Sequence, residues 1–310
     1  METKTNIRAS AIITTFNRKI LLEKAMRSVL AQTFQDFELI ILDNSSKDGT
    51  EELVKKMAAE DSRIVYVRHP QLNIAQARNL GVRTARGEFL GFLDDDDEWL
   101  PRKLELQVGL FDKSPASVAL VYGGFNRVTT SGEIYNTFTP RLRGKVFDGY
   151  FCGHDPLTGS ASNPLIRKSA FDVSGLYDEN IKSSEDWEMY LRLARDFEFE
   201  YVKEPVVDIR AHAGPRLGDK LEDAAQAEII ACGKFADYLA AHPTCRSYYL
   251  QTIGGKYCRV GKAAVGRRYL REAITVAPGN TVARVQILLS YLGAPTYRWF
   301  HKTYQRMRKG

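Results

Sequence analysis

The sequence predicts an α/β protein in which a mixed sheet flanked by helices is followed by an all-helical C-terminal region. In the first hundred residues, short apolar runs alternate with segments of helical periodicity, the pattern of a parallel sheet covered by helices. Between residues 118 and 147, short strand-like runs alternate with Gly and Ser turns. Beyond residue 219 the periodicity is helical, with breaks at Gly, Pro and Asn.

The first hundred residues predict four strands and three helices, joined by short polar connections. A few polar residues between elements are typical of βαβ units, in which each helix returns the chain to the same edge of the sheet. The predicted strands are Ala9–Thr15, Phe37–Asp43, Ile64–Arg68 and Phe89–Leu93, and the predicted helices are Leu21–Ala31, Thr50–Ala59 and Ile74–Thr84.

The remaining elements extend the sheet and then leave it. We expect residues 118–147 to add an antiparallel extension to the sheet. A helix is predicted at Glu185–Asp196, and short strands at Glu200–Val202 and Val206–Arg210 complete this part. The sequence therefore predicts two domains, residues 1–218 and a basic helical region of residues 219–310.

The composition is that of a soluble globular protein, with 44% hydrophobic and 26% charged residues. The longest nearly apolar stretch, Val285–Gly293, is far shorter than the ~20 residues that a membrane-spanning helix needs. The N-terminal residues lack the apolar segment of a signal peptide. We therefore expect a cytoplasmic protein.

The positive charge is concentrated at the C-terminus. Residues 243–310 contain 13 Lys or Arg and one acid, a net charge of +12, whereas the rest of the chain carries −6. A helix expected over Pro295–Lys309 mixes aromatic and basic residues, which is typical of a helix at an anionic membrane surface. The alternative is that these aromatic residues pack on their own domain. A nucleic-acid partner is not expected, because no RNA- or DNA-binding signature is present.

Polar clusters follow three of the predicted strands. They begin at Thr15, at Asp43 and at Asp94. In open α/β sheets, ligands bind outside the carboxyl ends of the strands. The sequence therefore predicts a binding site at this edge of the sheet.

Four consecutive aspartates, Asp94 to Asp97, follow the apolar strand that begins at Phe89. Adjacent negative charges repel one another, and a divalent cation with hard oxygen ligands relieves that repulsion. The alternative is a solvated acidic turn. The position of the cluster at the end of a buried strand favours metal binding.

Several linked motifs resemble glycosyltransferase family 2, in the order and spacing of that family. The resemblance covers about two thirds of the chain, roughly to His212, and several motifs in order are more specific than any one. The motifs are Ile12-Ile13-Thr14-Thr15-Phe16-Asn17-Arg18, Phe37 to Thr50, Ala77-Arg78-Asn79-Leu80-Gly81, and Phe92-Leu93-Asp94-Asp95-Asp96-Asp97.

The resemblance implies a GT-A fold, a Rossmann-like mixed sheet, and inverting transfer from a nucleotide-diphospho-sugar, with a UDP-sugar as the expected donor. It implies a divalent metal, Mn²⁺ or Mg²⁺, and a glycan or lipid-linked acceptor. Asp97 is expected to be a supporting acid. The resemblance places Thr15, Asn17, Asp43, Arg78, Asp94 and Asp95 at the nucleotide, and Asp96 and His212 at the metal.

Asp186 is the expected general base. The segment around Glu185-Asp186-Trp187 resembles the part of the family that carries its catalytic acid pair. Acids in a first helical turn are also favoured by the helix dipole without any catalytic role. Likewise, His212 could be an ordinary surface histidine. Asn163 is a further candidate for facing the acceptor.

Two other function classes compete with a transferase. A non-catalytic module that binds nucleotide sugars is the alternative within the same fold, and intact Asp94, Asp96 and Asp186 argue against it. A dinucleotide-dependent oxidoreductase is disfavoured because no GxGxxG motif follows the first strand.

The expected location is the cytoplasm, with peripheral attachment at the inner face of the membrane.

Overall fold

The computed structural model describes residues 7–153, 157–211 and 220–307. The chain divides into two compact units. The first comprises residues 1–179 and 189–214, and the second comprises residues 180–188 and 215–310. The predicted domain boundary between residues 218 and 219 stays a prediction.

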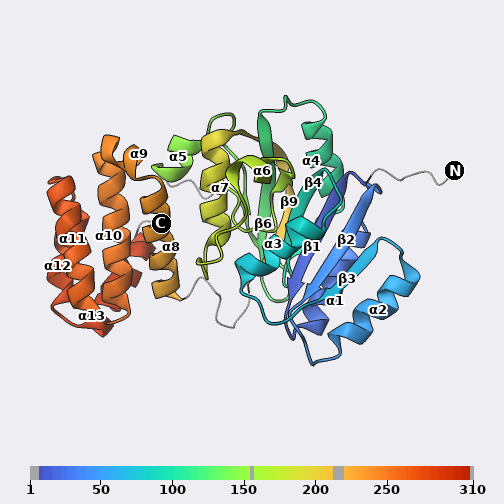
Figure 1. The fold of residues 1–310 in the computed structure, drawn as a ribbon. Coiled ribbons are helices and arrows are strands. Elements are labelled where there is room, and N and C mark those ends of the chain that lie inside the picture. Colours follow the sequence, from blue (N-terminus) through green and yellow to red (C-terminus); the bar gives the residue numbers. More distant parts are fainter. Residues whose placement is uncertain (1–6, 154–156, 212–219, 308–310) are drawn as a thin grey trace. The chain divides into compact units, whose positions relative to one another are not determined.

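The N-terminal half of the first unit is a parallel βα repeat (Figure 1). All four predicted strands and all three predicted helices are present, and most of their bounds agree to within one residue. The elements are β1 (Ala9–Thr15), α1 (Lys19–Leu30), β2 (Phe37–Asp43), α2 (Thr50–Glu60), β3 (Ile64–Arg68), α3 (Ile74–Thr84) and β4 (Phe89–Asp94).

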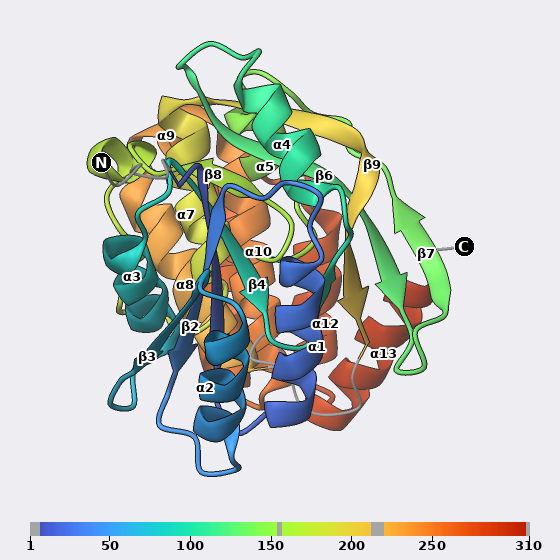
Figure 2. The ribbon, with the colours of Figure 1, turned by 90° about the vertical axis from the view of Figure 1, so that its right-hand side faces the viewer.

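Both faces of these strands are buried, which is why their sequences are continuous apolar runs. Figures 1 and 2 show α1 and α2 on one face and α3 on the other. Ala11 and Ile13 belong to the same buried cluster as the apolar residues of α1 and α2. On the opposite face, a side chain on Gly81 of α3 would come within 2.8 Å of Ile12.

Within the described residues, nine strands form one sheet in the order β3-β2-β1-β4-β8-β6-β9-β5, and β7 pairs with β6. The antiparallel extension predicted over residues 118–147 is present as β6 and β7, which pair antiparallel to each other. Strand β8 also runs antiparallel to β6, whereas β9 pairs with β6 in parallel. The added strands are β5 (Glu98–Trp99), β6 (Val118–Val128), β7 (Ile134–Phe138), β8 (Leu165–Arg167) and β9 (Glu198–Arg210).

Strand β9 is one long strand where the sequence predicted two short ones. Pro205 lies near its middle and cannot donate a ladder hydrogen bond. The register with β6 shifts on both sides of Gly124, so the strand passes Pro205 through an irregular step. A side chain on Gly124 would lie 2.9 Å from the carbonyl oxygen of Lys203, which explains why glycine is needed there.

In the described residues, four helices lie between β5 and β9 in the order of the chain. Helix α4 packs against β6 and β9. The predicted helix Glu185–Asp196 is present as α7 with the same bounds. The four are α4 (Lys103–Phe111), α5 (Phe147–Phe151), α6 (Ala170–Ser174) and α7 (Glu185–Asp196).

The second unit is helical, as predicted for the C-terminal region. Its core joins Cys258, Leu270, Ala273, Ala283 and Tyr297. Across the described ranges, no helix combines the length and apolarity required to cross a bilayer. The helices are α8 (Leu221–Lys234), α9 (Ala236–Ala241), α10 (Pro243–Arg259), α11 (Ala263–Val276), α12 (Thr281–Ser290) and α13 (Ala294–Met307).

Candidate active site

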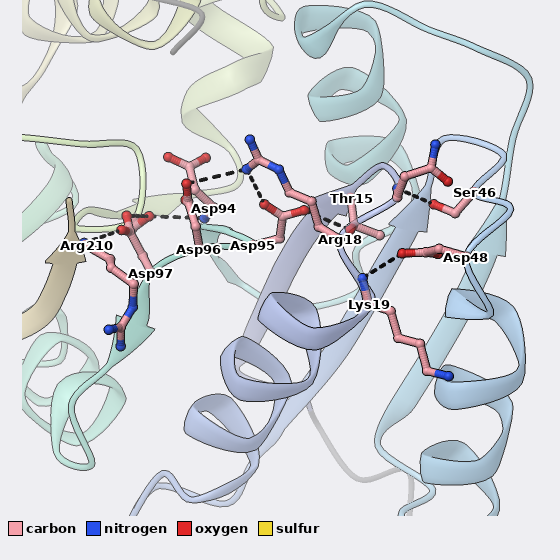
Figure 3. Close-up of polar contacts among 12 residues, drawn as sticks. Thr15, Arg18, Lys19, Ser46, Asp48, Asp94, Asp95, Asp96, Asp97 and Arg210 are labelled. Atoms are coloured by element: carbon pink, nitrogen blue, oxygen red, sulfur yellow. Dashed lines mark hydrogen bonds and ion pairs between the residues drawn. The ribbon is translucent and has the colours of Figure 1, made fainter. Parts of the chain in front are cut away.

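The carboxyl ends of β1, β2 and β4 are level with one another. Thr15 pairs with Asp43 across β1 and β2, and Thr14 pairs with Asp94 across β1 and β4. The Thr15 hydroxyl donates to Asp95 Oδ2 at 2.8 Å (Figure 3). The predicted convergence of polar clusters at this edge is therefore present in the structure.

The loops after β1 and β2 are tied together by their own polar groups. Asn17 and Ser45 adopt left-handed backbone with φ of 52° and 63°, a conformation that Asn tolerates better than most residues. The Asn17 N–H donates to Ser46 Oγ at 2.9 Å, and the Lys47 N–H donates to Asn17 Oδ1 at 2.8 Å. These bonds give the edge of the site a fixed shape.

Asp43 is fully buried at the end of β2. Its Oδ1 accepts a hydrogen bond from the Ser46 N–H at 2.9 Å, and its Oδ2 accepts one from the Tyr66 hydroxyl at 2.7 Å. Burial and the Asp43 carboxylate raise the pKa of Tyr66. Tyr66 therefore stays protonated and keeps the Asp43 carboxylate oriented.

Arg18 and Arg78 bring positive charge to the row of aspartates. Arg18 Nη1 lies 2.9 Å from Asp95 Oδ1 and 3.4 Å from Asp96 Oδ2, as Figure 3 shows. Arg78, buried in α3, donates to Asp94 Oδ1 at 3.3 Å. Burial raises the pKa of Asp95 to about 6, although Arg18 and Thr15 act in the opposite direction.

Asp97 is buried, with only 3% of its surface exposed. Its Oδ2 accepts hydrogen bonds from Ser162 Oγ at 2.7 Å and Ser160 Oγ at 3.2 Å. Its Oδ1 accepts from the Arg210 N–H at 3.0 Å. Burial, reinforced by the neighbouring Asp94 and Asp96 charges, raises the pKa of Asp97 well above its ordinary value. Asp97 is thus an anchor between β4 and the end of β9.

Helix α3 is held at its start by a capping box. Asn73 Oδ1 accepts from the Gln76 N–H at 2.9 Å, and Gln76 Oε1 accepts from the Asn73 N–H at 3.0 Å. Asn79, next to Arg78, exchanges hydrogen bonds with the backbone of Tyr177 and donates to Glu179. Arg78 therefore approaches the aspartates from a firmly seated helix.

Residues 10–174 match the family model described as glycosyl transferase family 2. The chain belongs to glycosyltransferase family 2. The predicted family, the enzyme class of glycosyltransferase and the GT-A-like α/β fold are confirmed.

Two relatives of this glycosyltransferase have named activities. An Escherichia coli UDP-Glc:alpha-D-GlcNAc-diphosphoundecaprenol beta-1,3-glucosyltransferase, WfgD, is 30% identical over 60% of this chain and 70% of its own length. A Campylobacter jejuni GalNAc(5)-diNAcBac-PP-undecaprenol beta-1,3-glucosyltransferase is 41% identical. That match covers 37% of this chain and 37% of the relative.

The fold is also similar to that of a solved structure. TarS of S. aureus, as a fragment in complex with UDP-GlcNAc, superposes with a TM-score of 0.70 at 15% sequence identity. The superposition covers 96% of this chain and 92% of that chain. At this identity the similarity concerns the fold.

The structure brings most of the predicted site residues of this glycosyltransferase to one edge of the sheet: Thr15, Asn17, Asp43, Arg78, Asp94, Asp95 and Asp96. Asp186 lies in the first turn of α7, in the segment that groups with the second unit, and its Oδ1 accepts from the Trp187 N–H at 2.8 Å. His212 lies outside the described residues.

The suggestion that Asn163 faces the acceptor is wrong. Its side chain is fully buried, where it accepts from the Gly123 N–H and donates to the carbonyl oxygens of Gly123 and Thr158. An amide whose donors and acceptor are all used by buried backbone groups has a structural task. Asn163 fixes its own segment to β6.

The carboxylates at the end of β4 suit a hard divalent cation. Asp94 and Asp96 offer oxygen ligands of the kind that Mg²⁺ and Mn²⁺ prefer. Among the described residues, no three or more His, Cys, Asp or Glu side chains gather as a metal cage. Two carboxylates complemented by phosphate oxygens of a substrate are the usual way of binding Mg²⁺ in phosphate sites.

Sequence reasoning missed three residues of this site. Arg18 follows the Thr-Phe-Asn motif directly, so its position after β1 was a usable signal. Ser160 and Ser162 hold Asp97 from more than 60 residues away. No local pattern marks these serines as partners of an aspartate.

Proposed function

We propose that this glycosyltransferase moves a sugar, with inversion, from a nucleotide-diphospho-sugar to a hydroxyl of a lipid-linked glycan. The observation that carries the proposal is the row Asp94–Asp96 at the carboxyl end of β4, facing Arg18 and Arg78. Carboxylates next to guanidinium groups at the switch point of an α/β sheet suit a metal-bridged diphosphate.

The donor is a UDP-sugar in this proposal. Thr15, Asn17 and Asp43 lie at adjoining strand ends, where a nucleoside would fit beside the diphosphate. TarS, which has a similar fold, binds UDP-GlcNAc, and the name of WfgD specifies UDP-Glc. Asp95, held by Thr15, would complete the wall around the ribose.

Asp186 is the proposed base. The acceptor oxygen attacks the anomeric carbon while the bond from that carbon to the diphosphate oxygen breaks, and the electron pair leaves with the diphosphate. Asp186 takes the hydroxyl proton, which makes the attacking oxygen more nucleophilic. Asp186 lies in the first turn of α7.

A divalent cation, Mg²⁺ or Mn²⁺, would be held by Asp96 with help from Asp94, and we propose His212 as a further ligand. When bound, it supplies Lewis-acid stabilisation of the departing diphosphate. Arg18 and Arg78 add fixed positive charge near the same place. Since such a leaving group is already well stabilised, the chain needs no general acid.

We further propose that the acceptor brings the enzyme to the inner face of a membrane. The names of both relatives specify undecaprenol-linked acceptors. In the second unit, Leu288, Tyr291 and Leu292 are exposed, and the guanidinium of Arg267 lies 4.4 Å from the Tyr291 ring centroid. Exposed apolar side chains next to arginines are suited to anionic lipid headgroups.

The decisive experiment is a screen of nucleotide sugars for release of nucleoside diphosphate, with Mn²⁺, with Mg²⁺ and with EDTA. We expect release from a UDP-sugar in the presence of metal, and faster release when undecaprenyl-diphosphate-linked GlcNAc is added. Nucleotide binding without turnover under any condition would instead support a non-catalytic module. Release of nucleoside diphosphate that is unchanged by EDTA would contradict the proposed dependence on a divalent metal.

A further inference from the structure

Lys103, in the first turn of α4, is a fully buried lysine. Its ammonium donates to the carbonyl oxygen of Asn163 and, at 2.6 Å, to Gln107 Oε1. The same nitrogen lies 4.8 Å from the ring centroid of Trp99. Within the described ranges no carboxylate pairs with it, and burial lowers its pKa well below the usual value.

The carbonyl that Lys103 holds belongs to an irregular segment, residues 158–163, in which Thr158, Ala161, Ser162 and Asn163 are buried. Gln107 donates to the same Asn163 carbonyl oxygen at 3.0 Å and to that of Val121 in β6 at 3.0 Å. Buried backbone groups outside helices and sheets need side-chain partners. Lys103 and Gln107 supply those partners, so α4 fixes the end of this segment.

The residue before Asn163 connects the segment to the aspartates. Ser162 Oγ donates to Asp97 Oδ2 at 2.7 Å and accepts from the Asp94 N–H at 3.0 Å. The Ser162 carbonyl oxygen accepts from Trp99 Nε1 at 2.8 Å. One serine thus holds both ends of the aspartate row, and its own position depends on the contacts made by Asn163.

We propose that Lys103 is a positioning residue of the donor site, which acts through Asn163 and Ser162 to hold the Asp94–Asp97 row in the geometry that binds a metal-bridged diphosphate. The inference rests on the proposed function. Burying an amine without an acidic partner is costly, and an apolar side chain would fill the same space more cheaply. The buried amine is instead needed as the donor to the Asn163 carbonyl oxygen, a bond that an apolar side chain could not make.

The test compares Lys103→Met with the wild type in UDP affinity, measured by calorimetry with Mn²⁺ and with EDTA. Methionine keeps most of the volume and removes the donor. We expect the affinity with Mn²⁺ to fall about 10- to 100-fold, as for outer-shell partners of metal ligands, and the affinity in EDTA to change less than about twofold. An equal loss with and without Mn²⁺ would mean general loosening and would overturn the proposal.

Two further variants sharpen the result. Ser162→Ala should lose the same Mn²⁺-dependent affinity, and the double variant should be no more than about twofold weaker than Lys103→Met, because both act in one chain of contacts. Lys168→Met is the matched control, since Lys168 donates to a backbone carbonyl at Ala85, outside the segment. Additive losses, or a loss in the control as large as in Lys103→Met, would contradict the proposal.

Hydrogen exchange separates this inference from the proposed function. In Lys103→Met we expect amides of residues 94–97 and 158–163 to exchange at least about tenfold faster, and those of β2 to be unchanged. This readout needs no nucleotide or metal. If the wild type binds no UDP, the proposed function fails while exchange still decides the role of Lys103. Unchanged exchange in both segments would overturn the positioning role.

Discussion

The four aspartates at the end of β4 share one sequence motif but occupy four different environments. Asp94 pairs with Arg78, and Asp96 pairs with Arg18. Asp95 accepts hydrogen bonds from Thr15 and Arg18. Asp97 is buried and accepts hydrogen bonds from two serines and the Arg210 N–H. Burial raises the pKa of Asp95 and of Asp97. Asp97 is therefore an anchor, whereas Asp94, Asp95 and Asp96 are the residues that we propose bind ligand.

At this scale the first prediction concerns Asp96→Asn. An amide is a poorer ligand for a hard cation and leaves the diphosphate charge less balanced. We expect UDP affinity in Mn²⁺ to fall by at least about 10- to 100-fold, the range seen even for outer-shell partners. Calorimetry measures it, with Asp36→Asn, an exposed carboxylate of the same unit, as the control. Metal-stimulated affinity equal to wild type would remove Asp96 from the site.

The second residue-scale prediction concerns pH. The pKa of Asp95 is about 6 in the folded protein and 3.8 is its ordinary value. Between these values the folded state holds more protons than the unfolded state, so stability falls as pH rises through the window. A difference of about two pKa units corresponds to about 3 kcal/mol.

Asp95→Asn removes this titration. The free energy of unfolding of the wild type, relative to Asp95→Asn, should therefore fall by up to about 3 kcal/mol from pH 4 to pH 7. Urea unfolding in EDTA at four pH values measures the difference. A difference that is constant with pH would show that Asp95 does not titrate in this window.

At the scale of elements, the sequence locates β1 to β4 closely because buried strands in a parallel sheet are short apolar runs bounded by polar turns. Strand pairing is harder to predict. Strand β9 looks like two strands because Pro205 interrupts it, and the irregularity that accommodates this proline lies 81 residues away at Gly124. Contacts between residues so far apart in the chain produce no periodic pattern in the sequence from which they could be predicted.

Some residues of the candidate site could likewise be predicted from the sequence, and others could not. Thr15, Asp43 and Asp94 end predictable strands, and their convergence follows from the parallel arrangement. Asn163 was misassigned because a polar residue before an apolar run looks exposed in sequence, whereas its partners are backbone groups of β6. The hydroxyl groups of Ser160 and Ser162, which hold Asp97, could not be predicted from the sequence either, because serine is common in any loop.

Helix α7 gives the third prediction. Glu185, Asp186 and Glu188 lie in its first turn, where the helix dipole stabilises negative charge. Asp186→Asn keeps the shape and removes the base, so we expect transfer to fall by about two to four orders of magnitude with UDP affinity changed little. Steady-state transfer and calorimetry on the same variant separate the two effects. Transfer near the wild-type rate would place the base elsewhere, and the next candidates are Asp178, Glu179 and Glu185.

At the scale of the whole molecule, charge and exposed apolar surface are unevenly distributed. Residues 243–310 carry a net charge of +12, and Trp299 is 62% exposed there. Tyr297 of the same helix is buried in the core of the second unit, so α13 is partly a packing helix. The packing alternative from the sequence therefore holds for Tyr297, and membrane attachment stays a prediction.

The fourth prediction is that the full chain sediments with anionic vesicles and does so less at high salt. Each basic residue near such a surface contributes about 1 kcal/mol, and the attraction fades within a Debye length. A variant combining Leu288→Ser, Leu292→Ser and Trp299→Ser should bind several-fold less, while Val173→Ser, an exposed apolar residue of the first unit, should not differ. Equal failure to sediment with anionic and neutral vesicles would contradict membrane attachment.

The hydrogen bond from Arg210 to Asp97 spans 113 residues, and it has a consequence for the order of synthesis. The Asp94–Asp97 row leaves the ribosome early, but its anchor arrives only with the end of β9. Long-range parallel pairing of β6 with β9 is slow to form, because the loop between them must close first. A nascent chain ending near residue 174 contains the whole segment that matches the family model and still lacks the Arg210 N–H that bonds to Asp97. The contacts that hold Asp97 are therefore complete only when the chain has been made as far as Arg210.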